Sequence, residues 1–128
     1  MIYKEILDTF GKLLIEKTRD YQLECAEKTL EQKAKSPDYK QIGALLGDLE
    51  VSQKQAILEL VAHAVTGTLH GFFELIAWKN KQIKLVFTKD EQEYNLEQIS
   101  DGLAGEMFAK GGWIDKFSKY HFDENFMY

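Results

Sequence analysis

Residues 52–78 read SQKQAILELVAHAVTGTLHGFFELIAW, and this stretch decides the fold. Its apolar residues recur at steps of three and four, the spacing of one face of an α-helix. They are Ile57, Leu58, Val61, Val65, Leu69, Phe72, Phe73 and Ile76. Ser52 is an N-cap candidate, so we expect one long helix from Ser52 to about Trp78.

Three small residues, Ala64, Gly67 and Gly71, share a stripe beside that apolar side. A glycine inside a helix costs about 1 kcal/mol against alanine. The stripe therefore indicates either the close approach of another helix or a kink. One hypothesis that follows is a homo-oligomeric structural or regulatory domain with this stripe as its interface.

A second long helix is predicted before it, from about Ile2 to Ala34. Its apolar stripe is strong at first and weakens after Ile15, where Leu23 and Leu30 fall off it, so the second half should be more exposed. The stripe consists of Ile6, Leu7, Phe10, Leu13, Leu14, Tyr21 and Cys25.

The remaining segments are shorter. Ser36-Pro37 starts a helix to about Leu46, because serine can cap and proline fits the first helical position. The expected later elements are a strand at Ile83–Thr88, a second strand at Glu93–Asn95, a helix from Leu96 to Ala109 capped by Asn95 with Ile99, Leu103 and Met107 inside, a short helix with Trp113, Ile114 and Phe117, and a docked tail with Tyr120, Phe122, Phe126 and Tyr128. The predicted fold is mainly α, a helical bundle of about five helices with one small β-hairpin.

The composition of the chain argues against several classes of function. A chain of 128 residues is expected to form a single domain, 1–128. The net charge is −5 and no basic stripe is visible, which argues against nucleic-acid binding. Cys25 is the only cysteine, so no intrachain disulfide forms and a cytoplasmic location is expected. No run approaches about 18 consecutive apolar residues, so no membrane partner is expected.

Motifs for catalysis are missing, and we predict that the protein is not an enzyme and uses no cofactor. The sequence has neither a Gly-x-Ser-x-Gly elbow nor a phosphate-binding loop. One cluster has the spacing of metal ligands, and it gives the alternative of a small helical metal-binding enzyme. It consists of Glu59, His63, His70 and Glu74. A helical wheel places these four opposite Val61, Val65, Leu69 and Phe72, on the side that faces water or lies beneath a covering segment. This placement favours solvated i,i+4 pairs and no metal.

The acidic segment, Asp90 to Ala109, holds six acids and neither lysine nor arginine. A surface of one sign suits binding to a basic partner, and Trp113 and Phe117 follow as candidate aromatic anchors. The alternative is that these two rings belong to the core. The predicted partner-binding residues are Asp90, Glu91, Glu93, Glu97, Asp101, Glu106, Trp113 and Phe117.

The length and acidity of the chain, together with two segments near its C-terminus, indicate a resemblance to a known family. The segments are Ser100-Asp101-Gly102-Leu103-Ala104-Gly105-Glu106 and Gly112-Trp113-Ile114-Asp115-Lys116-Phe117-Ser118. The chain resembles the small acidic cytoplasmic immunity proteins that neutralise bacterial toxins, including those of contact-dependent growth inhibition. The resemblance implies a cognate toxin domain, often a basic nuclease, whose active or substrate-binding face the protein would occlude.

Overall fold

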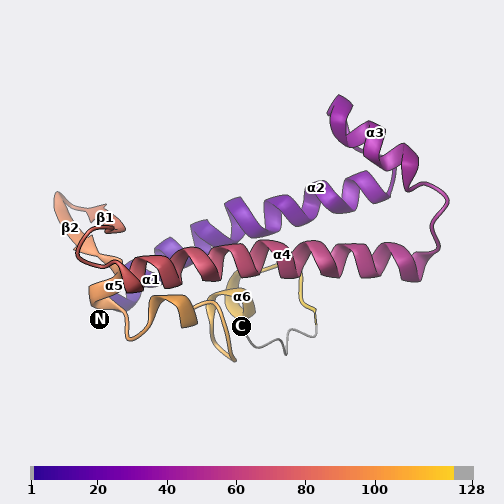
Figure 1. Cartoon of the computed structure of the whole chain (residues 1–128). Coiled ribbons are helices and arrows are strands. Elements are labelled where there is room, and N and C mark those ends of the chain that lie inside the picture. The colour runs from indigo at the N-terminus through magenta and orange to yellow at the C-terminus, as the bar shows by residue number, and fades with distance from the viewer. Residues whose placement is uncertain (1, 123–128) are drawn as a thin grey trace.

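The computed structural model describes residues 2–122, and it confirms a mainly helical fold with one hairpin. Two long helices run side by side along the molecule, with the hairpin at one end and a short helix at the other (Figure 1). The elements are α1 (Ile2–Leu14), a π-helical turn (Ile15–Arg19), α2 (Asp20–Leu30), α3 (Pro37–Leu45), α4 (Val51–Trp78), β1 (Val86–Lys89), β2 (Gln92–Asn95), α5 (Leu96–Ile99), a 3-10 turn (Leu103–Gly105) and α6 (Trp113–Phe117).

The predicted first helix runs through a π-helical turn that the sequence pattern did not reveal. This wider turn inserts an extra residue and rotates the buried face. Leu23 and Leu30, which fall off the predicted stripe, are consequently buried at 0% and 5% exposure. Tyr21 is instead 57% exposed and Cys25 is only half-buried, so the prediction for this half was wrong.

Helix α2 ends at Leu30, four residues before the predicted end. Gln32 takes a left-handed conformation with φ of 63°. The amide of Lys33 donates to the Lys28 carbonyl at 2.7 Å, and that of Gln32 donates to Thr29 at 3.2 Å. These two bonds are those of a Schellman motif, which closes a helix by satisfying its last carbonyls.

Helix α4 begins one residue before the predicted cap. Glu50, not Ser52, is its N-cap, and Glu50 and Gln53 form a reciprocal capping box. By length and composition α4 also fits a membrane span, with a mean hydropathy of 1.3 and 22% of the best window buried. Long apolar helices in the cores of water-soluble proteins pass the same test.

The main core joins α1, α4 and α6 through aromatic rings. Trp113 meets Phe10 and Phe73 edge to face, with ring centroids 5.7 and 6.2 Å away. Gly11 makes room for this indole, because a Cβ there would lie 2.4 Å from its ring atoms. A second cluster, between α2 and α4, consists of Leu23, Leu30, Leu58 and Ala62.

The predicted helix from Leu96 to Ala109 was wrong in length. Asn95 caps it as expected, accepting from the amides of Glu97 at 3.1 Å and Gln98 at 3.4 Å. The helix nevertheless stops at Ile99, because the Ser100 hydroxyl accepts from the Gly102 amide and turns the chain. The predicted inner residues keep their place without the helix: Leu103 and Met107 are buried, and Ile99 packs against the core.

The hairpin is shifted from the predicted strands. Ile83 donates its amide to the Lys79 carbonyl in the turn after α4, so the ladder starts only at Val86. Lys89 pairs with Gln92, which leaves a two-residue turn. Its residues Asp90 and Glu91 both have positive φ, 51° and 67°.

This turn leads to a prediction, because type I′ turns favour Asn-Gly where both central residues have positive φ. Changing Asp90→Asn together with Glu91→Gly is expected to stabilise the protein by about 1 kcal/mol, since glycine meets no steric penalty there. Urea denaturation would measure it. The matched change Gln92→Asn with Glu93→Gly, inside the strand, should destabilise, and a stabilising result there would contradict the explanation.

Candidate functional site

The structure distributes the acidic segment over three places. Asp90, Glu91 and Glu93 are exposed on the hairpin, Glu97 lies on α5, and Asp101 and Glu106 line an open pocket. The hairpin and α5 lie at the same end of the molecule, beside the start of α1 (Figure 1). The predicted acids thus gather at one end without forming a single patch.

The hairpin acids are the most accessible members. Lys89, next to them, lies with its ammonium 4.0 Å from a carboxylate oxygen of Glu5. This pairing partly neutralises the one lysine that adjoins the turn. Asp90, Glu91 and Glu93 consequently present negative charge at the tip of the hairpin.

Glu97 differs from the other acids. It is half-buried, and its Oε2 is a buried atom without a hydrogen-bond partner among the described residues. Burial raises the pKa of Glu97 above its usual value, and the nearby charge of Glu74 raises it further. Glu97 is therefore poorly suited to present a negative charge to a partner.

The pocket that Asp101 and Glu106 line has a volume of about 610 Å³ and mixes both signs of charge. Lys4, Lys110 and Lys116 also line it. The one-signed character of the acidic segment is consequently lost here, because α1, α6 and the loop before α6 supply cations.

Asp8 anchors two of those lysines. It accepts from Lys4 at 3.0 Å and from Lys116 at 2.7 Å. Burial alone would raise the pKa of Asp8, but hydrogen bonds from Lys116 and Lys4 lower it below the usual value. On the acidic side, the Ser100 hydroxyl donates to Glu106 at 3.1 Å and holds that carboxylate in place.

The two predicted aromatic anchors, Trp113 and Phe117, are less exposed than the hairpin acids. Trp113 is 2% exposed in the core, so its side chain is not available to a partner in this fold. Phe117 is half-buried against the same core, with the Lys116 ammonium 5.2 Å from its ring centre. For Trp113 the alternative interpretation, that it is core, is the correct one.

The four α4 residues with the spacing of metal ligands do not form one cluster. They are Glu59, His63, His70 and Glu74. His70 lies 3.6 Å from Glu74, but its other ring nitrogen is 3.3 Å from the Ala104 carbonyl and its ring packs on Phe108. Among residues 2–122 no three histidine, cysteine or acidic side chains come together as metal ligands would. The alternative of a metal-binding enzyme has no support in this geometry.

Sequence reasoning missed a buried polar network around Arg19, the only arginine in the chain. Arg19 is 0% exposed and Asp20 2% exposed. The guanidinium donates to Thr66 of α4 at 3.0 Å, to Asp20 at 3.2 Å and to Ser118 at 2.7 Å. A single arginine among fifteen lysines was the available signal, since arginine's fork suits buried pairs.

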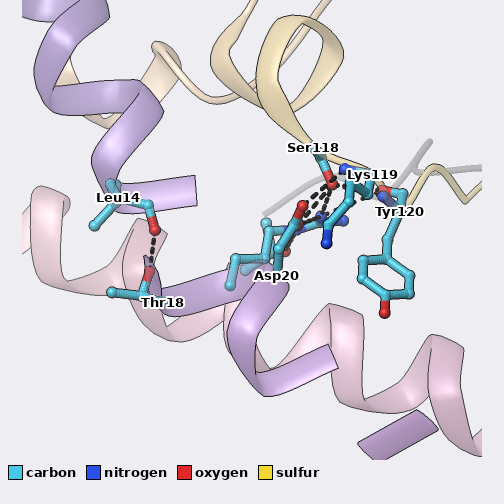
Figure 2. Close-up of polar contacts among 8 residues, drawn as sticks. Leu14, Thr18, Asp20, Ser118, Lys119 and Tyr120 are labelled. Atoms are coloured by element: carbon cyan, nitrogen blue, oxygen red, sulfur yellow. Dashed lines mark hydrogen bonds and ion pairs between the residues drawn. The ribbon is translucent and has the colours of Figure 1, made fainter. Parts of the chain in front are cut away.

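The same network fixes the segment after α6. Asp20 accepts from the Ser118 hydroxyl and from the Lys119 amide, both at 2.7 Å (Figure 2). The Tyr120 hydroxyl donates to Glu27 at 3.1 Å, and burial together with that bond raises the pKa of Tyr120 to about 12. Tyr120 is thus docked as predicted, whereas Phe126 and Tyr128 lie outside the described residues.

A model of one protein family, described as a family of unknown function (DUF6547), matches residues 1–114. The matched region contains all six acids of the acidic segment and the whole of α4. No curated protein and no solved structure matches the chain.

Proposed function

We propose that this chain, which belongs to the DUF6547 family of unknown function, is an immunity protein that binds and neutralises a basic toxin domain in the cytoplasm. Four exposed acids at the end of the molecule that holds the hairpin, called the hairpin-end acids, would contact the basic substrate-binding face of that toxin. They are Asp90, Glu91, Glu93 and Asp101. In the simplest case the toxin is a nuclease. Binding there occludes the face and stops the toxin without any chemistry by the inhibitor.

One observation supports this proposal best. Asp90, Glu91 and Glu93 stand exposed on a two-stranded hairpin, and the neighbouring Lys89 is directed to Glu5. Asp101, also exposed, lies in the loop after α5. Charges arranged in this way steer a basic partner and raise its association rate. The argument concerns these four acids. It leaves out Trp113, which is in the core, and three further predicted residues that are half-buried: Glu97, Glu106 and Phe117.

The test compares two variants with equal changes in charge. The first neutralises the hairpin end, with Asp90→Asn, Glu91→Gln, Glu93→Gln and Asp101→Asn. The second neutralises four exposed acids elsewhere: Glu16→Gln, Glu31→Gln, Asp38→Asn and Asp48→Asn. Affinity capture from the native cells, read by mass spectrometry, is expected to yield one basic partner with wild type and the second variant, and to lose it with the first.

Growth then tests the immunity role. Cells that express the captured partner alone should stop growing, and co-expression of the wild-type chain should restore growth. The variant neutralised at the hairpin end should restore it poorly. A captured partner that does not harm growth would contradict the immunity role, and equal capture by both variants would contradict the role of the hairpin end.

A further inference from the structure

We propose that the exposed face of α4 is a homodimer interface, through which two copies of this chain pair with their α4 helices antiparallel. This inference is independent of the proposed function, because the face belongs to α4 and none of the hairpin-end acids lies on it. It commits to a second copy of the chain as the occupant.

The exposed face is defined by the helical positions opposite the buried side of α4. At about 100° per residue, six residues between Leu60 and Trp78 fall within an arc of about 80°. They are Leu60, Ala64, Gly67, Gly71, Leu75 and Trp78. Leu58, Ala62, Phe73 and Ile76 point the other way, into the two cores.

Large apolar side chains on this face are in water. Leu60 is 68% exposed, Leu75 41% and Trp78 75%. Together these three expose roughly 370 Å² in each copy, judged from the size of such side chains. Each partner of a stable complex buries about 800 Å², so these side chains alone supply nearly half of it before the exposed backbone between them is counted.

The middle of the face is built for close approach. Ala64 is exposed, and a Cβ added at Gly71 would meet no described atom within 4 Å. Gly71 therefore serves no packing contact in the described chain, although a glycine there costs about 1 kcal/mol of helix stability. Small residues at this point let a second helix come near.

The order of residues favours the antiparallel arrangement, because four of the six lie symmetrically about the point between Gly67 and Thr68. Leu60 of one copy then faces Leu75 of the other, and Ala64 faces Gly71. Large side chains meet at both ends and small ones meet in the middle, as a two-fold axis requires.

Charge supports the same direction. The side chain of Glu74, at the edge of the face, is 61% exposed. In an antiparallel pair the two Glu74 side chains are separated by thirteen helical positions, roughly 20 Å at 1.5 Å per residue. A parallel pair would place them side by side with like charges in contact, which is destabilising.

The test measures molar mass by light scattering for the full chain in detergent-free buffer, over a wide range of concentration. Wild type is expected to be a dimer that dissociates on dilution. Gly71→Leu should be a monomer with an unchanged or higher melting temperature, because the new side chain has room in the monomer and leucine favours helix. Gln55→Leu, exposed on α4 outside the face, adds the same apolar surface and should remain a dimer.

Cross-linking tests the direction. In a Cys25→Ser background, Leu60→Cys mixed with Leu75→Cys should oxidise to the mixed dimer, and each variant alone should cross-link poorly. A monomeric wild type at every concentration would overturn the proposal, as would a Gly71→Leu chain that still dimerises. Monomeric wild type that instead sediments with phosphatidylcholine–phosphatidylglycerol vesicles would overturn it in favour of a membrane contact by α4.

Discussion

Replacing Arg19 by methionine is expected to lower the free energy of unfolding by about 3–5 kcal/mol, the usual cost of removing one partner of a buried ion pair. Methionine keeps most of the volume, so the loss is chiefly of charge and hydrogen bonds. Asp20, 2% exposed, would keep its bonds from Ser118 and Lys119 but would lose its ion pair with the Arg19 guanidinium. Thr66 on α4 would lose its donor as well.

Urea denaturation followed by circular dichroism measures this change. Lys17→Met is the matched control, since Lys17 lies in the same π-helical turn and is exposed. It should change stability by no more than about 0.5 kcal/mol. If Arg19→Met had the same free energy of unfolding as the control, the Arg19 network would not be what holds the segment after α6 to α2. The structural role assigned to Arg19 would then be wrong.

The second large effect is expected for Trp113→Ala, at about 3–5 kcal/mol of lost stability. The indole fills the space between Phe10, Phe73 and the backbone at Gly11, so its removal leaves a cavity that rigid neighbours cannot fill. The same measurement on the chain's only other tryptophan provides a control. Trp78 is 75% exposed, and Trp78→Ala should cost the monomer little.

This pair of variants also separates packing from binding. If Trp113 were a surface anchor, Trp113→Ala would weaken partner binding and leave the melting temperature unchanged. The fold predicts the reverse order, with a large fall in stability. A melting temperature equal to that of wild type would contradict the placement of Trp113 in the core.

Much of the fold could be predicted from the sequence because the periodic patterns were long. The helix over α4 was located to within one residue of its observed start and at its end, and α3 to within one residue of its observed end. A short helix with Trp113, Ile114 and Phe117 was also expected, and it is α6. Local departures from regular helix geometry were harder to predict. The π-helical turn over Ile15–Arg19 reversed the burial expected for Leu23 and Tyr21, and no local sequence pattern indicates such a turn.

The helix predicted after Asn95 shows a different limit. The apolar spacing of Ile99, Leu103 and Met107 correctly identified inner residues, yet Ser100 and Gly102 end the helix early. Burial was predictable there because the core needs those side chains. The path of the backbone was not, because a serine hydroxyl competes with the helical hydrogen bonds.

The candidate site was predictable in composition but not in arrangement. In the sequence Asp101 and Glu106 are near other acids, in a segment without lysine or arginine. In the fold, Lys4 of α1 and Lys116 of α6 line the same pocket as these two acids. Contacts between residues more than a hundred positions apart, such as Lys116 with Asp8, depend on tertiary packing. The accessible negative charge is therefore smaller than the acidic segment implied, and it is centred on the hairpin.

The most direct test of the central claim is the association rate constant for the captured basic partner, measured against ionic strength. For wild type and for the variant neutralised at Glu16, Glu31, Asp38 and Asp48, the rate should be high in low salt and fall steeply as salt is added. The variant neutralised at Asp90, Glu91, Glu93 and Asp101 should associate more slowly, with a flatter dependence on salt. Equal association rates for the two variants would contradict the claim that the hairpin end recognises the partner.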